Sequence, residues 1–277
     1  MAEAGDFSVR FWGVRGSIAC PGPETMRYGG DTSCLEVRCG EHLLIFDGGT
    51  GLRKFGRHLD AQDPIDADLY LTHTHWDHIG GLPFFSPAFD PKNRLRMWAG
   101  HLLPDNTLEQ VLNTMITGPF FPVPLDIFGA DIVYHDFVCG EVLRPRPGIT
   151  LGTAPLNHPN GATGYRLEYG GRAMCYVTDT EHVPGELDRN VLGLIEGADI
   201  LIYDSTYTDE EFPRHLKWGH STWQEGIRLC EAAGVKTLVI FHHDPGHNDA
   251  FMDKVAAEAE RTRPGTLVAR DNMILNL

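Results

Sequence analysis

Short apolar runs alternate with glycine- and proline-rich turns along this chain, and several of the runs end in a histidine or an aspartate. Residues Phe7–Trp12 alternate between apolar and polar side chains, which predicts an edge or half-buried strand. Residues 35–38 and 42–47 flank a Gly40-Glu41 turn and predict a hairpin. A glycine-rich turn then leads into a predicted helix over 52–59.

The later part of the chain predicts further strands and helices. Strands are expected where apolar runs recur, over 95–99, 153–156, 173–177 and 237–241. Helices are expected over 107–115 and from a Ser221 or Thr222 cap to Gly234. Aromatic residues set between prolines at 83–87 and 117–124 indicate stiff apolar loops. Such loops form a pocket wall or lid, cover a sheet edge, or contact a second copy in a homodimer.

The stretch Leu69–Gly81 carries the clearest chemistry. Its apolar start predicts a buried strand, and the residues that follow alternate so that His73, His75 and Asp77 can point the same way. His78 faces a different direction. Imidazole and carboxylate are the ligands of hydrolytic zinc-type sites, and this arrangement fits two metal ions held ~3.5–4 Å apart. The alternative is a cluster of surface histidines beside a turn.

The spacing His-x-His-x-Asp-His resembles the signature of the metallo-β-lactamase fold. The resemblance implies an α/β (α+β) protein built as a four-layer αββα sandwich, with the motif on the loop after a strand. It covers most of the chain, from Phe11 to the His242 region. We therefore expect a single hydrolase domain over residues 1–277, with 83–142 as a lid or pocket-wall insertion.

Three further ligands follow from the same resemblance. His158 lies at a strand-to-loop junction, and Asp179 ends an apolar strand, where a carboxylate is a reasonable bridging ligand. His242 and His243 both follow the last apolar run, and neighbours on a strand face opposite ways. The tRNase Z-like pattern places His242 on the metal. His243 would then either contact a metal-ligating residue without binding the metal itself or face the substrate. His247 is a weaker candidate for the last metal ligand.

Asp47 also ends a strand beside the metal motif. A carboxylate there can accept the free N–H of a ligating histidine and fix its tautomer. The alternative is a cap at the start of the following helix. The residues alone leave both roles open.

The segment Gly219–Thr222 resembles the His-Ser-Thr helix start of tRNase Z and of the cyclic phosphodiesterases near it. That resemblance implies that His220 is the general acid; otherwise it is a helix-start histidine bonded to a carboxylate. The expected cofactor is a pair of divalent ions, zinc first, with manganese and iron as alternatives. These ions would yield a bridging hydroxide, and Asp77 would orient or deprotonate its water.

Charge and composition reduce the number of plausible substrate classes. The formal net charge of −15 opposes binding of a nucleic acid polymer, although basic residues recur among 92–96 and 144–146. The arm with which tRNase Z grips tRNA is not evident in 83–142. We therefore expect a small phosphodiester, such as a cyclic nucleotide or a cyclic sugar phosphate. A carbonyl hydrolase acting on a lactone, thioester or β-lactam is the main alternative, ahead of tRNA processing, di-iron oxidoreduction or a non-catalytic scaffold.

The remaining features concern the cellular compartment of the protein. No stretch approaches the ~20 apolar residues of a membrane helix, and residues 1–6 lack the pattern of a signal peptide. The expectation is a cytoplasmic protein with no membrane partner. The six cysteines are scattered without a Cys-x-x-Cys pair, which indicates reduced thiols rather than disulfides.

Overall fold

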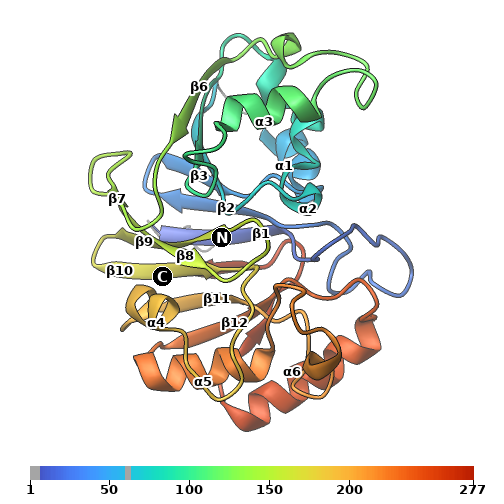
Figure 1. Ribbon diagram of the computed structural model, residues 1–277, viewed down its shortest axis with the longest axis vertical. Helices are drawn as coiled ribbons and strands as arrows, with labels where there is room; N and C mark the ends of the chain where they lie inside the picture. The colour runs from blue at the N-terminus through green and yellow to red at the C-terminus, as the bar shows by residue number, and fades with distance from the viewer. Residues whose placement is uncertain (1–6, 60–63) are drawn as a thin grey trace, which may run out of the picture.

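A computed structural model describes residues 7–59 and 64–277. Two seven-stranded sheets pack face to face, and helices cover the outer face of each, as Figure 1 shows. The predicted four-layer αββα sandwich is therefore confirmed. The helices over the first sheet are α1 (Gly51–Leu59), α2 (Trp76–Ile79) and α3 (Leu108–Met115). Those over the second sheet are α4 (Arg189–Ile195), α5 (Trp223–Ala233) and α6 (Asp249–Thr262).

Each sheet mixes antiparallel and parallel pairs. The first sheet has the order β14 (Ile274–Asn276), β1 (Phe7–Gly13), β2 (Cys34–Cys39), β3 (His42–Phe46), β4 (Asp66–Leu71), β5 (Arg94–Ala99) and β6 (Asp131–Asp136). The second has the order β13 (Leu267–Val268), β12 (Thr237–Phe241), β11 (Ile200–Asp204), β10 (Arg172–Val177), β9 (Ala162–Tyr169), β8 (Thr150–Leu156) and β7 (Val142–Leu143). Strands β3 to β6 run parallel to one another, as do β10 to β13. Parallel strands end at the same edge, so the residues that follow them gather there.

The core between the sheets is rich in aromatic side chains. Phe46 lies at its centre, with ring centroids 5.3 Å from Tyr70, 5.4 Å from Tyr165 and 5.9 Å from Tyr176. These four residues are fully buried and come from four strands of the two sheets. The hydroxyl of Tyr165 also donates a 2.6 Å hydrogen bond to the carbonyl of Leu71, directly before the metal motif. The second sheet thus supports the strand end on which the motif lies.

The strands and helices predicted from the sequence are all present. Helix α5 begins after the Thr222 cap and ends at Gly234, whose φ of 67° is left-handed, as expected of a C-terminal glycine. Several elements were not predicted, among them β6, β9, β11, α4 and α6. Residues 83–142 contribute β5 and β6 to the first sheet, as well as α3 and 3-10 helices at Ser86–Phe89 and Leu125–Ile127. Another 3-10 helix, Leu82–Phe84, begins one residue before this range. A further 3-10 helix, Phe212–Arg214, precedes α5.

Two expectations about the whole chain can be compared with the structure. All six cysteines are free thiols, as predicted. No helix within 7–59 and 64–277 is long and apolar enough to cross a membrane. Residues 1–6, on which the expectation about a signal peptide rests, lie outside the described residues.

Truncation of the central aromatic side chain should destabilise the sandwich. Phe46→Ala would leave a cavity among Tyr70, Tyr165 and Tyr176, and we expect it to lower the free energy of unfolding by about 3–5 kcal/mol. Phe84→Ala is the matched control, since Phe84 is 55% exposed, and should cost less than about 1 kcal/mol. Urea denaturation measures both variants. Equal midpoints would contradict this description of the core.

Candidate metal centre

The predicted ligands come together at the edge where the parallel strands end. His73, His75, Asp77 and His78 follow β4, while His158 follows β8. Asp179 and His242 follow β10 and β12 of the second sheet. Their ligand atoms form overlapping groups, and within each group these atoms lie within 4.8 Å of one another. The fold thereby brings Asp77 into contact with His242, which is 165 residues away in the sequence.

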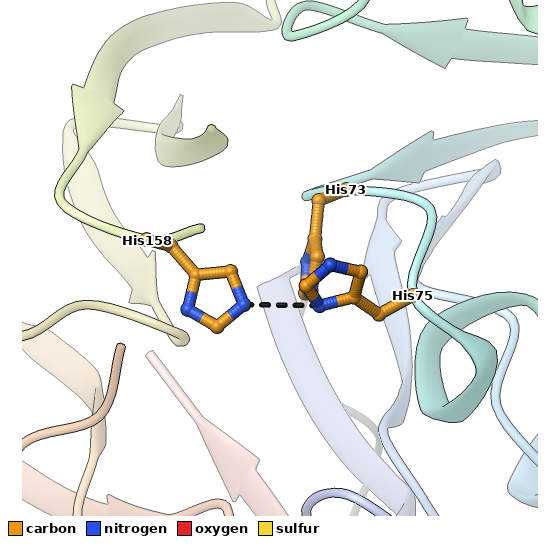
Figure 2. A group of neighbouring side chains, drawn as sticks. All are labelled: His73, His75 and His158. Atoms are coloured by element: carbon orange, nitrogen blue, oxygen red, sulfur yellow. Dashed lines mark hydrogen bonds between the residues drawn. The ribbon is translucent and has the colours of Figure 1, made fainter. Parts of the chain in front are cut away.

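One group consists of three histidines, His73, His75 and His158 (Figure 2). Nε2 of His158 lies 3.1 Å from Nδ1 of His75, and the His73 ring centroid lies 4.4 Å and 4.7 Å from those of His75 and His158. Nδ1 of His158 donates to the carbonyl of Gly219 over 2.8 Å. This hydrogen bond leaves the lone pair on Nε2 directed at the group, which is the tautomer a metal ligand needs.

A second, more buried group consists of Asp77, His78, Asp179 and His242. Nε2 of His78 and Nε2 of His242 each lie 3.2 Å from Oδ2 of Asp179. The same two nitrogens lie 3.2 and 3.3 Å from Oδ2 of Asp77. Two imidazoles and two carboxylates therefore converge on one point between the sheets.

Asp179 connects the two groups. While its Oδ2 faces His78 and His242, its Oδ1 lies 3.8 Å from Nε2 of His73 and 3.7 Å from Nε2 of His158. Burial disfavours the charge of this carboxylate, but the surrounding imidazoles outweigh burial and hold its pKa well below the usual range. An ionised carboxylate with one oxygen toward each group has the geometry of a bridging ligand.

The side chains fit divalent metal ions. Nε2 of His73 is buried and has no hydrogen-bond partner among the described residues. Buried polar atoms are otherwise almost always satisfied, so this nitrogen fits the role of a metal ligand. Histidine nitrogen and carboxylate oxygen are the donors that zinc and similar divalent ions take in hydrolytic sites.

Asp47 belongs to neither group but accepts a hydrogen bond from His78. Its Oδ2 accepts hydrogen bonds from Nδ1 of His78 over 2.9 Å and from the hydroxyl of Tyr176 over 2.8 Å. Its Oδ1 accepts from the backbone N–H of Thr72 over 2.8 Å. Helix α1 begins four residues later, at Gly51, and the hydrogen bond from Nδ1 of His78 is the contact that the first of the two roles, fixing a histidine tautomer, requires.

His220 lies beside the metal cluster and pairs with a residue that the sequence analysis missed. Its Nδ1 donates to Oδ2 of Asp204 over 3.1 Å and lies 3.7 Å from Oδ1 of Asp179. Burial opposes a positive charge on His220, but the carboxylate of Asp204 outweighs burial and raises its pKa to about 9. Asp204 ends the apolar run of β11, the same signal that pointed to Asp179.

His243 and His247 lie apart from the groups. Nε2 of His243 donates to the carbonyl of Ala269 over 2.9 Å, and burial lowers its pKa to about 3. His247 pairs with Oε1 of Glu211 over 2.9 Å. Of the two adjacent histidines, the structure therefore brings only His242 into the cluster. His243 packs edge-on against Tyr28, with ring centroids 6.1 Å apart.

The glycine-containing loop after β1 closes over the centre. A Cβ atom at Gly16 would overlap the ring of His242, so only glycine fits there. The backbone N–H of the next residue, Ser17, donates to Oδ2 of Asp77 over 2.7 Å. Gly16 thereby brings the backbone of this loop close to the last histidine of the cluster.

Comparisons with known proteins agree with this fold. Residues 42–243 match the protein family described as Beta-lactamase superfamily domain. A ribonuclease Z from Haloarcula marismortui is 25% identical, over 96% of this chain and 95% of the relative. Zn²⁺-bound PqqB from Methylobacterium extorquens has a TM-score of 0.73 at 18% identity, over 98% of this chain and 100% of that one. A diphosphatase from the PhnP family has a TM-score of 0.70 at 20% identity, with 98% of both chains covered.

The close approach at Gly16 can be tested without an activity assay. Gly16→Ala should displace the His242 ring and lower zinc affinity by about 10- to 100-fold, the cost typical of disturbing a ligand's support. Gly22→Ala is the control, because nothing lies within 4 Å of a Cβ atom there. Competition with a chromogenic chelator measures both affinities. Unchanged zinc affinity in Gly16→Ala would separate His242 from the metal site.

Proposed function

This chain belongs to the beta-lactamase superfamily and is a metal-dependent hydrolase, and from that premise we propose that it hydrolyses a small phosphodiester. A cyclic nucleotide or a cyclic sugar phosphate is the substrate class we favour. The observation that carries the proposal is the His220–Asp204 pair beside the histidine and aspartate groups. A proton donor in that place suits departure of an alkoxide from phosphorus.

In this proposal the protein holds two divalent ions, with zinc as the first expectation. His73, His75 and His158 would hold one ion, and Asp77, His78 and His242 the other, with Asp179 shared between them. The zinc in the crystal structure of PqqB supports the choice of metal. Manganese and iron accept the same donors, so availability also contributes to the choice.

The side chains have distinct tasks in hydrolysis. When bound, the ions supply an acidified water and neutralise charge on the phosphate. Asp77 would orient that water and accept its proton. Since Asp204 holds Nδ1 of His220, Nε2 is the nitrogen left to protonate the leaving oxygen. No serine or cysteine nucleophile is required.

RNA is a second candidate substrate, because curated relatives such as the Haloarcula marismortui protein are named ribonuclease Z. Two observations favour a small substrate instead. The formal net charge is −15. Moreover, arginines of the two basic runs are engaged in ion pairs: Arg94 with Asp131, and Arg96 and Arg146 with Asp66 and Asp68. Neutralised arginines contribute little attraction for a phosphate backbone.

The proposal predicts turnover of bis(p-nitrophenyl) phosphate by protein reconstituted with zinc or manganese. Release of p-nitrophenolate should stop on chelation and return when the metal is restored, with metal content measured in the same samples. An RNA oligonucleotide and a lactone serve as comparison substrates. Hydrolysis of the lactone alone by fully loaded protein would favour the carbonyl hydrolase and contradict the proposal.

Two substitutions separate metal binding from proton donation. His78→Ala should lose one ion, because it removes a nitrogen of the buried group. His220→Ala should keep both ions and lower kcat by about 10²–10⁴-fold, the usual contribution of a general acid.

Elemental analysis and steady-state kinetics give the two readouts. His215→Ala is the control for His220→Ala, since His215 lies on the same loop and stacks on Tyr207. Loss of metal in His220→Ala would show that His220 is a ligand and would remove it as the acid.

A further inference from the structure

A cavity of about 570 Å³ lies beside the metal loop, and none of the predicted ligands lines it. Its size is within the ~300–1,000 Å³ range of small-molecule sites. Thr74 and Trp76 of the metal loop form one side, and Gln110, Val111 and Met115 of α3 form the other. The cavity therefore joins the first sheet's outer helix to the loop that carries the predicted ligands.

The lining has the chemistry of a site for a flat ring. Trp76 is 68% exposed and Phe120 is 73% exposed. Such exposure is unusual for large aromatic side chains. Ile79 and Met115 add apolar surface. Oε1 of Gln110 accepts from the backbone N–H of Thr107, so its amide nitrogen is the group that can donate to the edge of a ring. Aromatic faces and an amide together bind heteroaromatic rings by stacking and hydrogen bonding.

The lining also has a charge preference. Its residues include the carboxylate of Asp105 but no lysine, arginine or histidine. A phosphate or other anion is therefore disfavoured in the cavity, whereas a neutral ring is accepted. Since the anion of a phosphodiester would lie at the metal centre, the cavity suits the uncharged part of the same molecule.

The cavity begins one residue away from the predicted ligands. Thr74 lies between His73 and His75, and Trp76 lies between His75 and Asp77. Oγ1 of Thr74 is also 3.2 Å from Nε2 of His101, which fixes this side of the loop. Residues that line the cavity and predicted ligands therefore alternate along the same loop.

We propose that this cavity binds the flat, uncharged ring of the phosphodiester substrate, stacked on Trp76 and Phe120 with its edge at Gln110. The inference rests on the proposed function and adds a substrate class to it. Two sources have this chemistry, the nucleobase of a nucleotide and the aryl group of an aryl phosphodiester. Both place one neutral ring beside one anionic phosphate, unlike a polymer with many phosphates.

The test measures binding of the ring without phosphate or hydrolysis. Saturation-transfer NMR with adenosine and with p-nitroanisole, two uncharged probes, on metal-loaded and metal-free protein, reports contact of each ring with the cavity. We expect signals from ring protons in both forms of the protein. Trp76→Ala and Val111→Phe, which respectively remove the stacking face and fill the cavity, should weaken binding by about tenfold or more.

Matched variants control for effects of substituting an exposed tryptophan or a residue of α3 outside the cavity. Trp218→Ala removes another exposed tryptophan, and Asn113→Ala changes an exposed amide on the same helix; neither residue lines the cavity. Both should bind the ring as the native protein does. Circular dichroism verifies the fold of each variant, and Trp76→Ala keeps the test valid if Val111→Phe does not fold.

The outcomes separate this inference from the proposed function. Adenosine binding supports a nucleotide substrate, and p-nitroanisole binding without adenosine binding supports an aryl ester. Absence of binding by either ring, or equal binding in Trp76→Ala, Val111→Phe and native protein, would overturn the inference. Ring binding by a protein that hydrolyses no phosphodiester would support the cavity and refute the proposed reaction.

Discussion

The buried carboxylate of Asp179, set between two groups of histidines, is the interaction on which the rest of the centre depends. Asp47, Asp179 and Asp204 are all at most 1% exposed and lie along the same edge of the sandwich. A buried charge is costly unless it is paired and hydrogen-bonded. Each carboxylate is accordingly met by a histidine: His78 at Asp47, His220 at Asp204, and several imidazoles at Asp179. Divalent cations at the centre would complete this compensation.

The fold supplies that arrangement through parallel strands. Strands β3 and β4 end together and place Asp47 beside the start of the metal motif, while β10, β11 and β12 end together and place Asp179, Asp204 and His242 in a row. Packing the sheets face to face brings the two rows into contact. The aromatic core around Phe46 lies directly behind them, so the same packing that stabilises the sandwich also sets the distances within the centre.

Much of this could be predicted from the sequence because the chemistry is local or carried by a family pattern. The motif at 73–78 lies within six residues, and His158, Asp179 and His242 follow recognisable apolar runs. Asp204 was missed because its strand was not predicted and its partner, His220, lies 16 residues further on. The role of Asp47 depends on Thr72, which follows β4, and on Tyr176 of β10. The ion pairs of the basic runs could not be predicted from the sequence alone, because only the register of β4 against β5 places Asp66 and Asp68 opposite arginines.

Crystals of the zinc-loaded protein, measured at the zinc absorption edge, would test the central claim most directly. The account predicts two anomalous peaks, one on each side of the Asp179 carboxylate. One peak should adjoin His73, His75 and His158, and the other Asp77, His78 and His242. A single peak, or a peak coordinated by His220 and Asp204, would contradict a dinuclear centre bridged by Asp179.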